Sequence, residues 1–149
     1  MKRHAAFIPL SREHHEALLL ATRLMQGRKA LERLWSHDLM WQAKYVVDFF
    51  DGHLAEHFRV EEELLFPEVT PYLAKEDDVV TLLLEEHAEM REMTELLRQP
   101  TEKKLECTLA RFGEILERHI RREERLLFPF CEAHLPPEKL EELGRAMQH

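Results

Sequence analysis

The chain has 149 residues, of which 44% are hydrophobic and 34% are charged, a balance typical of one soluble globular domain. Its formal net charge of −8 argues against a general nucleic-acid binder, because such a protein needs a basic face. No apolar run approaches the ~18 residues that a membrane span requires. The isolated cysteines, Cys107 and Cys131, are typical of a reducing compartment. We therefore expect a single domain over residues 1–149, located in the cytoplasm, with no nucleic-acid or membrane partner.

The first two segments with helical periodicity lie in the N-terminal half of the chain. The first begins after Pro9, with Ser11 as its N-cap, and Gly27 either ends or weakens it. The second is expected to be stopped by Pro67 and Pro71, because proline breaks a helix interior. Its core-facing residues are spaced three or four apart: Leu39, Ala43, Val46, Phe50, His53, His57, Glu61 and Leu64.

The C-terminal half contains two more long amphipathic segments and a short one. A third helix is expected over residues 79–97, and the break after it ends at Thr101, which can cap the fourth helix. Core-facing positions of the fourth helix are Leu105, Leu109, Phe112, Leu116, His119, Glu123 and Leu126. Residues 136–147 form a short amphipathic tail with proline in the first turn.

Short connections between long helices imply antiparallel neighbours. The sequence therefore predicts an all-α fold, an up-down-up-down four-helix bundle with a short extra helix at the C-terminus. A coiled-coil dimer is the alternative within this class. The prolines and the internal repeat described next argue against it.

A sequence motif of eleven residues occurs twice in the chain. HFRVEEELLFP covers residues 57–67 and HIRREERLLFP covers residues 119–129, sixty-two positions later, with eight identical positions. Each copy places a histidine and a glutamate four residues apart, about 6 Å along one helix face. The repeat therefore indicates either symmetric packing alone or symmetric chemistry.

Polar residues interrupt the apolar face of every long helix. His57 and Glu61 lie on the second helix, His119 and Glu123 on the fourth, and His87 on the third, while the His14-His15 pair lies on the first. A lone core histidine or a single helix pair has an ordinary structural explanation. Together these groups favour a metal site, because buried charge is costly unless it is paired or bound to metal.

The residue types indicate which metals fit. Imidazole and carboxylate groups suit Fe, Mn or Zn, and the absence of cysteine from the set disfavours a structural zinc site. Two carboxylates and four imidazoles exceed what one tetrahedral ion needs. Two metals bridged by Glu61 and Glu123, with two histidines on each, use every group.

The order of these residues resembles the hemerythrin-like (HHE cation-binding) family, from SREHHEAL through HFRVEEELLFP and LEEHAEM to HIRREERLLFP. The resemblance implies a four-helix bundle around two iron ions, with bridging carboxylates and an oxo or hydroxo bridge, although Mn or Zn suits the same residues. Members of the family bind O2, sense oxygen or iron, handle nitric oxide or peroxide, or help repair iron–sulfur clusters.

Carried over by position, the resemblance assigns six metal ligands: His15, His57, Glu61, His87, His119 and Glu123. His15 is chosen on the first helix because it precedes Leu18 by three residues, as His87 precedes Met90. His14 is the alternative. Three neighbouring glutamates are expected on solvated helix faces: Glu62, Glu86 and Glu124, with support of a metal ligand as the alternative role for Glu86.

The chain departs from the oxygen-carrying hemerythrins at one position. Those proteins have HxxxH on the third helix, whereas here Arg91 stands four residues after His87. The ligand set is one imidazole short, which puts stable oxygen carriage in doubt. His53 either supplies the missing nitrogen or supports a ligand through a hydrogen bond.

Three functions are compatible with these features. The first is a di-iron protein that binds or reduces a small ligand (O2, NO or peroxide), with a possible oxidoreductase activity. The second is an iron-responsive sensor or metal-storage module that acts through a protein partner. The third is a metal-free interaction bundle.

Overall fold

The computed structural model describes residues 2–74 and 78–148, and this part of the chain contains helices and turns but no strand. The α-helices are α1 (Ile8–Gln26), α2 (Leu39–Phe49), α3 (Ala55–Val60), α4 (Phe66–Val69), α5 (Val79–Arg98), α6 (Glu102–Arg122), α7 (Phe128–His134) and α8 (Pro137–Met147). Three π-helical segments of five residues join some of them without a break: Phe50–Leu54, Glu61–Leu65 and Glu123–Leu127. As a result, α2–α4 form one continuous rod and α6–α7 form another.

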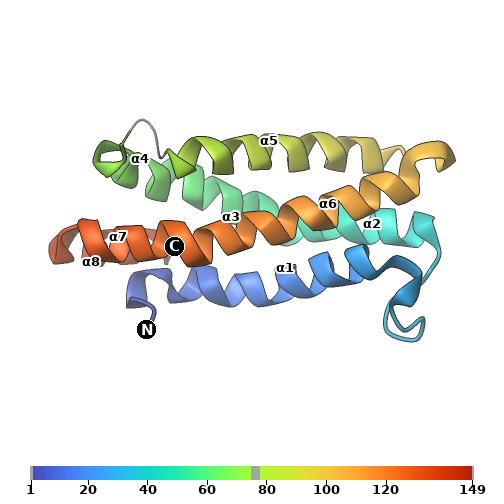
Figure 1. Cartoon of the computed structure of the whole chain (residues 1–149), viewed down its shortest axis with the longest axis horizontal. Coiled ribbons are helices and arrows are strands. Elements are labelled where there is room, and N and C mark those ends of the chain that lie inside the picture. Colours follow the sequence, from blue (N-terminus) through green and yellow to red (C-terminus); the bar gives the residue numbers. More distant parts are fainter. Residues whose placement is uncertain (1, 75–77, 149) are drawn as a thin grey trace.

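The long helices form a bundle. Figure 1 shows α1, the α2–α4 rod, α5 and the α6–α7 rod lying along one common axis. Helix α6 packs against both α1 and α5, and α2 packs against α5. The predicted C-terminal helix is present as α8, and it packs on the short 3-10 turn Ala5–Phe7 at the start of the chain. None of the described helices is long and apolar enough to cross a membrane.

Local chemistry explains most helix ends. Helix α1 ends at Gly27, whose φ of +55° is easily adopted only by glycine. Helix α5 begins after Asp78, whose carboxylate accepts the backbone N–H of Thr81. The expected N-cap Ser11 was wrong, because α1 already begins at Ile8 and Ser11 lies inside the helix.

The second rod ends between the two prolines expected to stop it: Pro67 does not break the α-helix, which ends at Val69 before Pro71. The π segment Glu61–Leu65 closes with the N–H of Phe66 bonded to the carbonyl of Glu61, so the wide turn is complete before the proline. Pro67 then occupies the first turn of α4, where a missing N–H costs little. The helix continues to Val69.

The π segments also shift which residues face the interior. Each adds one residue to a turn, and the buried face moves one position along the chain. The expected core residue His53 is exposed while Leu54 is buried, and Leu126 is 54% exposed while Leu127 is fully buried. The spacing of the sequence pattern was therefore wrong within these π segments, at His53 and Leu126, although it held at His57 and Glu61.

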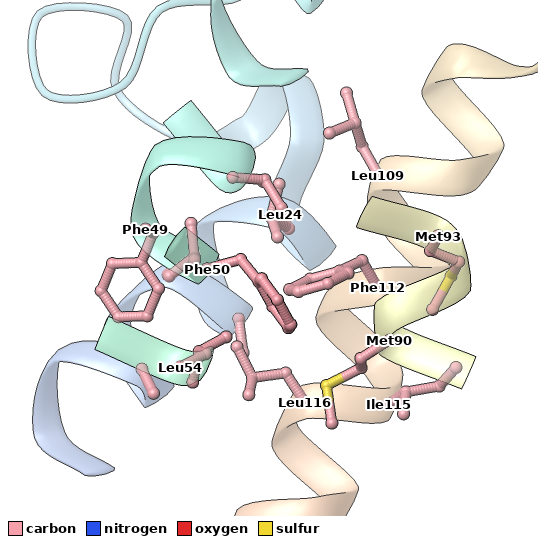
Figure 2. Packing of buried hydrophobic residues seen from close by; sticks show 14 of the residues in the cluster. Leu24, Phe49, Phe50, Leu54, Met90, Met93, Leu109, Phe112, Ile115 and Leu116 are labelled. Atoms are coloured by element: carbon pink, nitrogen blue, oxygen red, sulfur yellow. The ribbon is translucent and has the colours of Figure 1, made fainter. Parts of the chain in front are cut away.

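The apolar interior consists of two clusters with a polar layer between them. The larger cluster lies toward the α2 end of the bundle, and Figure 2 shows its aromatic and aliphatic side chains, among them Phe50, Phe112, Leu116 and Met90, packed between the rods. The smaller cluster lies toward α8 and includes Phe128. The buried histidines and glutamates described below separate the two.

Candidate metal centre

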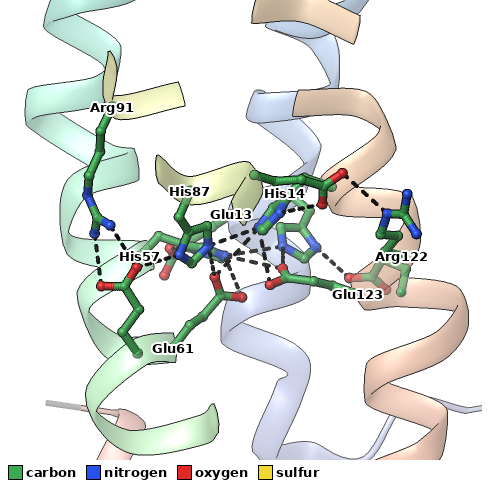
Figure 3. A network of polar contacts seen from close by, with 12 residues as sticks. Glu13, His14, His57, Glu61, His87, Arg91, Arg122 and Glu123 are labelled. Carbon is green, nitrogen blue, oxygen red and sulfur yellow. Dashed lines mark hydrogen bonds and ion pairs between the residues drawn. The ribbon is translucent and has the colours of Figure 1, made fainter. Parts of the chain in front are cut away.

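Six buried side chains from all four rods meet in the polar layer (Figure 3). They are His14 of α1, His57 of α3, Glu61 at the start of a π segment, His87 of α5, His119 of α6 and Glu123 at the start of another π segment. None is more than 4% exposed. They form two groups of four, each with ligand atoms within 4.8 Å of one another, and both groups contain Glu61 and Glu123.

The atoms at the centre fit a pair of cations. The Nε2 atoms of His14 and His57 lie 3.2 Å apart, and those of His87 and His119 lie 3.1 Å apart. Within the described part of the chain, Oε2 of Glu61 and Oε2 of Glu123 are buried without a hydrogen-bond partner. Buried acceptors of this kind are costly unless something satisfies them, and metal ions would do so.

The other ring nitrogen of each histidine contacts a second carboxylate. The four Nδ1 pairs are His14 with Glu124 (2.6 Å), His57 with Glu13 (2.6 Å), His87 with Glu62 (2.6 Å) and His119 with Glu86 (3.1 Å). An ionised carboxylate only accepts, so each Nδ1–H donates, and the Nε2 atom that faces the centre is a ligand whenever it is not protonated. This arrangement fixes ring orientation in metal-binding histidines.

Arginines hold two of these carboxylates in turn. Arg91 donates to both oxygens of Glu62, at 2.8 and 3.0 Å. Arg118 and Arg122 donate to one oxygen of Glu86, at 2.8 and 3.2 Å. His87 and His119 are therefore each held by a carboxylate, and each of these carboxylates is held in turn by arginine.

Charges in the metal-free cluster are strongly coupled. Burial disfavours the imidazolium form of His57 and His119, but the surrounding carboxylates outweigh it and raise both pKa values well above the ordinary value. Burial likewise disfavours an ionised Glu123, yet His119 and His14 lower its pKa well below normal. Protons on the imidazoles thus balance the buried carboxylates, and cations can take their place.

The structure corrects the choice of histidine on α1. His15 is exposed, whereas His14 is buried with its Nε2 atom 2.9 Å from Glu123 Oε1. The buried residues of α1 are Leu10, His14, Ala17, Leu20, Ala21 and Leu24, and His14 lies three residues before Ala17. The small residues Ala17 and Ala21 were the signal in the sequence, but the alignment on Leu18, three residues after His15, led to the wrong register.

Other expectations about neighbouring residues also change. Glu86 is buried, and Glu62 and Glu124 are half-buried, so the prediction of solvated positions was wrong for all three. His53 is exposed and lies outside both four-residue groups, although it lines a small cavity beside them. Sequence reasoning missed Glu13 altogether. A pattern was available: Glu13 and Glu86 directly precede a clustered histidine.

The fold and the centre together define a helical bundle with a buried histidine–glutamate cluster suited to metal cations. The model of the hemerythrin HHE cation binding domain matches residues 6–131. The chain therefore belongs to the hemerythrin HHE cation-binding family. No curated protein and no solved structure shows significant similarity to it.

Proposed function

We propose that the chain holds two iron ions and binds or reduces a small ligand such as O2, NO or peroxide. The supporting observation is the pair of four-residue groups that share Glu61 and Glu123. When bound, an iron pair supplies redox chemistry that these side chains lack by themselves. Membership of the family favours iron, while the same side chains also suit Mn or Zn.

The residues would have distinct roles. Glu61 and Glu123 would bridge the two ions, because each belongs to both groups. One ion would be held by His14 and His57, and the other by His87 and His119. Their Nδ1 partners would orient the rings and increase the basicity of the Nε2 atoms.

A small cavity supports a ligand of a few atoms. It has a volume of about 10 Å³, close to one water-sized sphere, and it touches His14, His57 and His119. Its walls are mostly apolar and include Leu54, Phe58 and Leu116. A cavity this small admits O2, NO or peroxide far more readily than an organic substrate.

The arginine at position 91, where oxygen-carrying hemerythrins have a histidine, supports a role in binding or reducing a ligand and not in stable oxygen carriage. Its guanidinium is engaged by Glu62 and lies 5.7 Å from the centre of the Phe58 ring, so it offers no nitrogen to the cluster. Each ion would then have two imidazoles and the shared carboxylates. Coordination positions would be left for solvent or an external ligand.

An iron-responsive or metal-storing role is the second candidate. Its support is a chain of contacts from the cluster to the start of the protein. Glu124, the partner of His14, accepts a bond from Ser11 and contacts Arg3. The adjacent turn Ala5–Phe7 lies under α8. Loss of metal would be transmitted to this surface, where a protein partner would detect it.

The direction of the rods, the single domain and the cellular compartment are also part of the proposal. We infer that successive rods alternate in direction and form one domain, because short connections join long helices. The free thiols of Cys107 and Cys131 support a reducing compartment such as the cytoplasm.

Metal analysis beside an absorption spectrum tests the proposal. We expect about two irons per chain and the visible bands of a bridged diferric pair. Glu61→Ala or Glu123→Ala should abolish paired binding, whereas Glu63→Ala, an exposed neighbour in the same run, should not. Folded protein without metal, or variants that keep both ions, would refute the assignment.

A second measurement separates the two candidates. O2, NO and peroxide are added in turn to the reduced protein, and its spectrum is followed. Rapid change with one of them supports ligand binding or reduction. A spectrum that responds to none, in protein that gains and loses iron readily, supports sensing or storage.

A further inference from the structure

The two four-residue groups of the cluster are related by repeats in the sequence, so their residues can be compared position by position. The repeated motif relates Glu61 and Glu62 to Glu123 and Glu124, sixty-two residues later. A second offset of seventy-three residues relates the Glu-His doublet of α1, residues 13–14, to that of α5, residues 86–87. One half-site contains His14 and His57, and the other contains His87 and His119.

The half-site of His87 and His119 is firmly supported. The carboxylate behind His119, Glu86, is only 4% exposed and accepts bonds from two arginines. Glu62, behind His87, accepts two bonds from Arg91. The His87 ring also stacks on Phe58, with ring centres 3.8 Å apart.

The half-site of His14 and His57 has weaker support. The Glu13 side chain, behind His57, is 54% exposed, and within the described part of the chain its only hydrogen bond is to that histidine. The Glu124 carboxylate, behind His14, accepts from Ser11 at 2.8 Å but from Arg3 only at a long 3.4 Å, since the short 2.8 Å bond of Arg3 goes to the Glu124 backbone carbonyl. The small cavity touches both of these histidines, whereas of the other half-site it touches His119 but not His87.

The sequence shows where the symmetry is broken. Arg118 and Arg122 of the second copy correspond to Glu56 and Val60 of the first, sixty-two residues earlier. Glu56 pairs with Arg59 on its own helix and supplies no cation to Glu13. By the second offset, Arg91 corresponds to Leu18. All three arginines are therefore absent from the equivalent positions around His14 and His57.

We propose that the two metal positions are inequivalent, and that the ion held by His14 and His57 is lost first, at a rate set by Glu13 as a positioning residue. The inference rests on the proposed function. Changes to such outer partners typically cost about 10–100-fold in metal affinity. A partly exposed carboxylate held by a single bond orients its histidine less firmly than one fixed by two arginines.

Iron release measures this difference directly. Protein loaded with ferrous iron without oxygen is mixed with excess of a coloured iron chelator, and release is followed with time. We expect two phases of equal amplitude. Glu13→Ala should accelerate the fast phase by about 10-fold or more and leave the slow phase unchanged. Glu16→Ala, an exposed residue of the same helix, is the matched control and should change neither.

Two further variants assign the phases. Arg118→Met frees one bond of Glu86 and should accelerate only the slow phase. Glu56→Arg supplies the cation that the first copy lacks and should slow the fast phase. Release of both ions in one phase, an unchanged fast phase in Glu13→Ala, or a fast phase governed by Arg118 would overturn the inference while leaving the iron pair intact. A chain that takes up no iron would instead refute the proposed function.

Discussion

His14 and His15 are neighbours in the sequence but lie on different sides of α1. His14 contacts His57, Glu123 and Glu124, whereas His15 is exposed. His14→Ala should remove one ion, lowering the iron content from two toward about one per chain. His15→Ala should retain both. Elemental analysis of the two variants checks this, and equal iron content would show that α1 supplies no ligand.

The two cysteines should differ sharply in reactivity. Burial, with a contribution from the Glu132 charge, raises the pKa of the Cys131 thiol to about 12. The thiol is therefore protonated at pH 8, and the thiolate is the reactive form. Cys107 is exposed. A thiol reagent at pH 8 should modify one thiol per folded chain quickly and the second only after unfolding; rapid modification of both would contradict this packing.

At the scale of single residues, the sequence predicted five of the six clustered side chains because chemistry and helical spacing coincide there. His57 with Glu61, and His119 with Glu123, stand four apart on seams that are otherwise apolar. The outer carboxylates were not predictable in the same way. Glu13 contacts a histidine 44 residues away, and its position directly before His14 does not indicate that distant partner.

At the scale of elements, periodicity predicted the long helices because each buries one apolar stripe. It did not predict the π segments. Where two leucines stand side by side, a shift of one residue still places a leucine on the buried face. Leu64-Leu65 and Leu126-Leu127 fit either register. The structure resolves this, because both π segments begin at a clustered glutamate and end just before Phe-Pro. Such π segments are common at functional sites.

The contact between α1 and α6 depends on a residue without a side chain. A Cβ on Gly113 would lie 2.8 Å from Leu24 Cβ and 3.0 Å from the carbonyl of Ala21. Gly113→Ala should therefore push the helices apart and lower the free energy of unfolding by about 1–3 kcal/mol. Urea unfolding measures this loss.

Gly52 is the matched control for Gly113, because it is also helical and a Cβ there meets nothing within 4 Å. Gly52→Ala should be neutral or raise stability by about 0.4–1 kcal/mol, since alanine has less freedom in the unfolded chain. Equal losses in both variants would show that the α1–α6 approach is not the cause.

At the scale of the whole molecule, the polar layer divides the interior into two apolar clusters. Residues from all four rods meet there, so the charge balance of this layer affects how the rods pack. Glu61 and Glu123 are each fully buried, and protons on His57 and His119 balance their charges in the metal-free protein. Cations can replace these protons and would then link the four rods by coordination bonds.

Metal should therefore raise thermal stability. At a free ferrous iron concentration 100 times the Kd, binding contributes about 2.7 kcal/mol. For a chain of this size the Tm should rise by roughly 5–10 °C. The double variant Glu61→Gln with Glu123→Gln should fold without metal, because it removes the buried like charges, and its Tm should not respond to iron. Calorimetry without oxygen compares the two proteins. An identical Tm for wild type with and without iron would mean that iron does not replace the protons of the histidines, and that the polar layer is a structural ion-pair network.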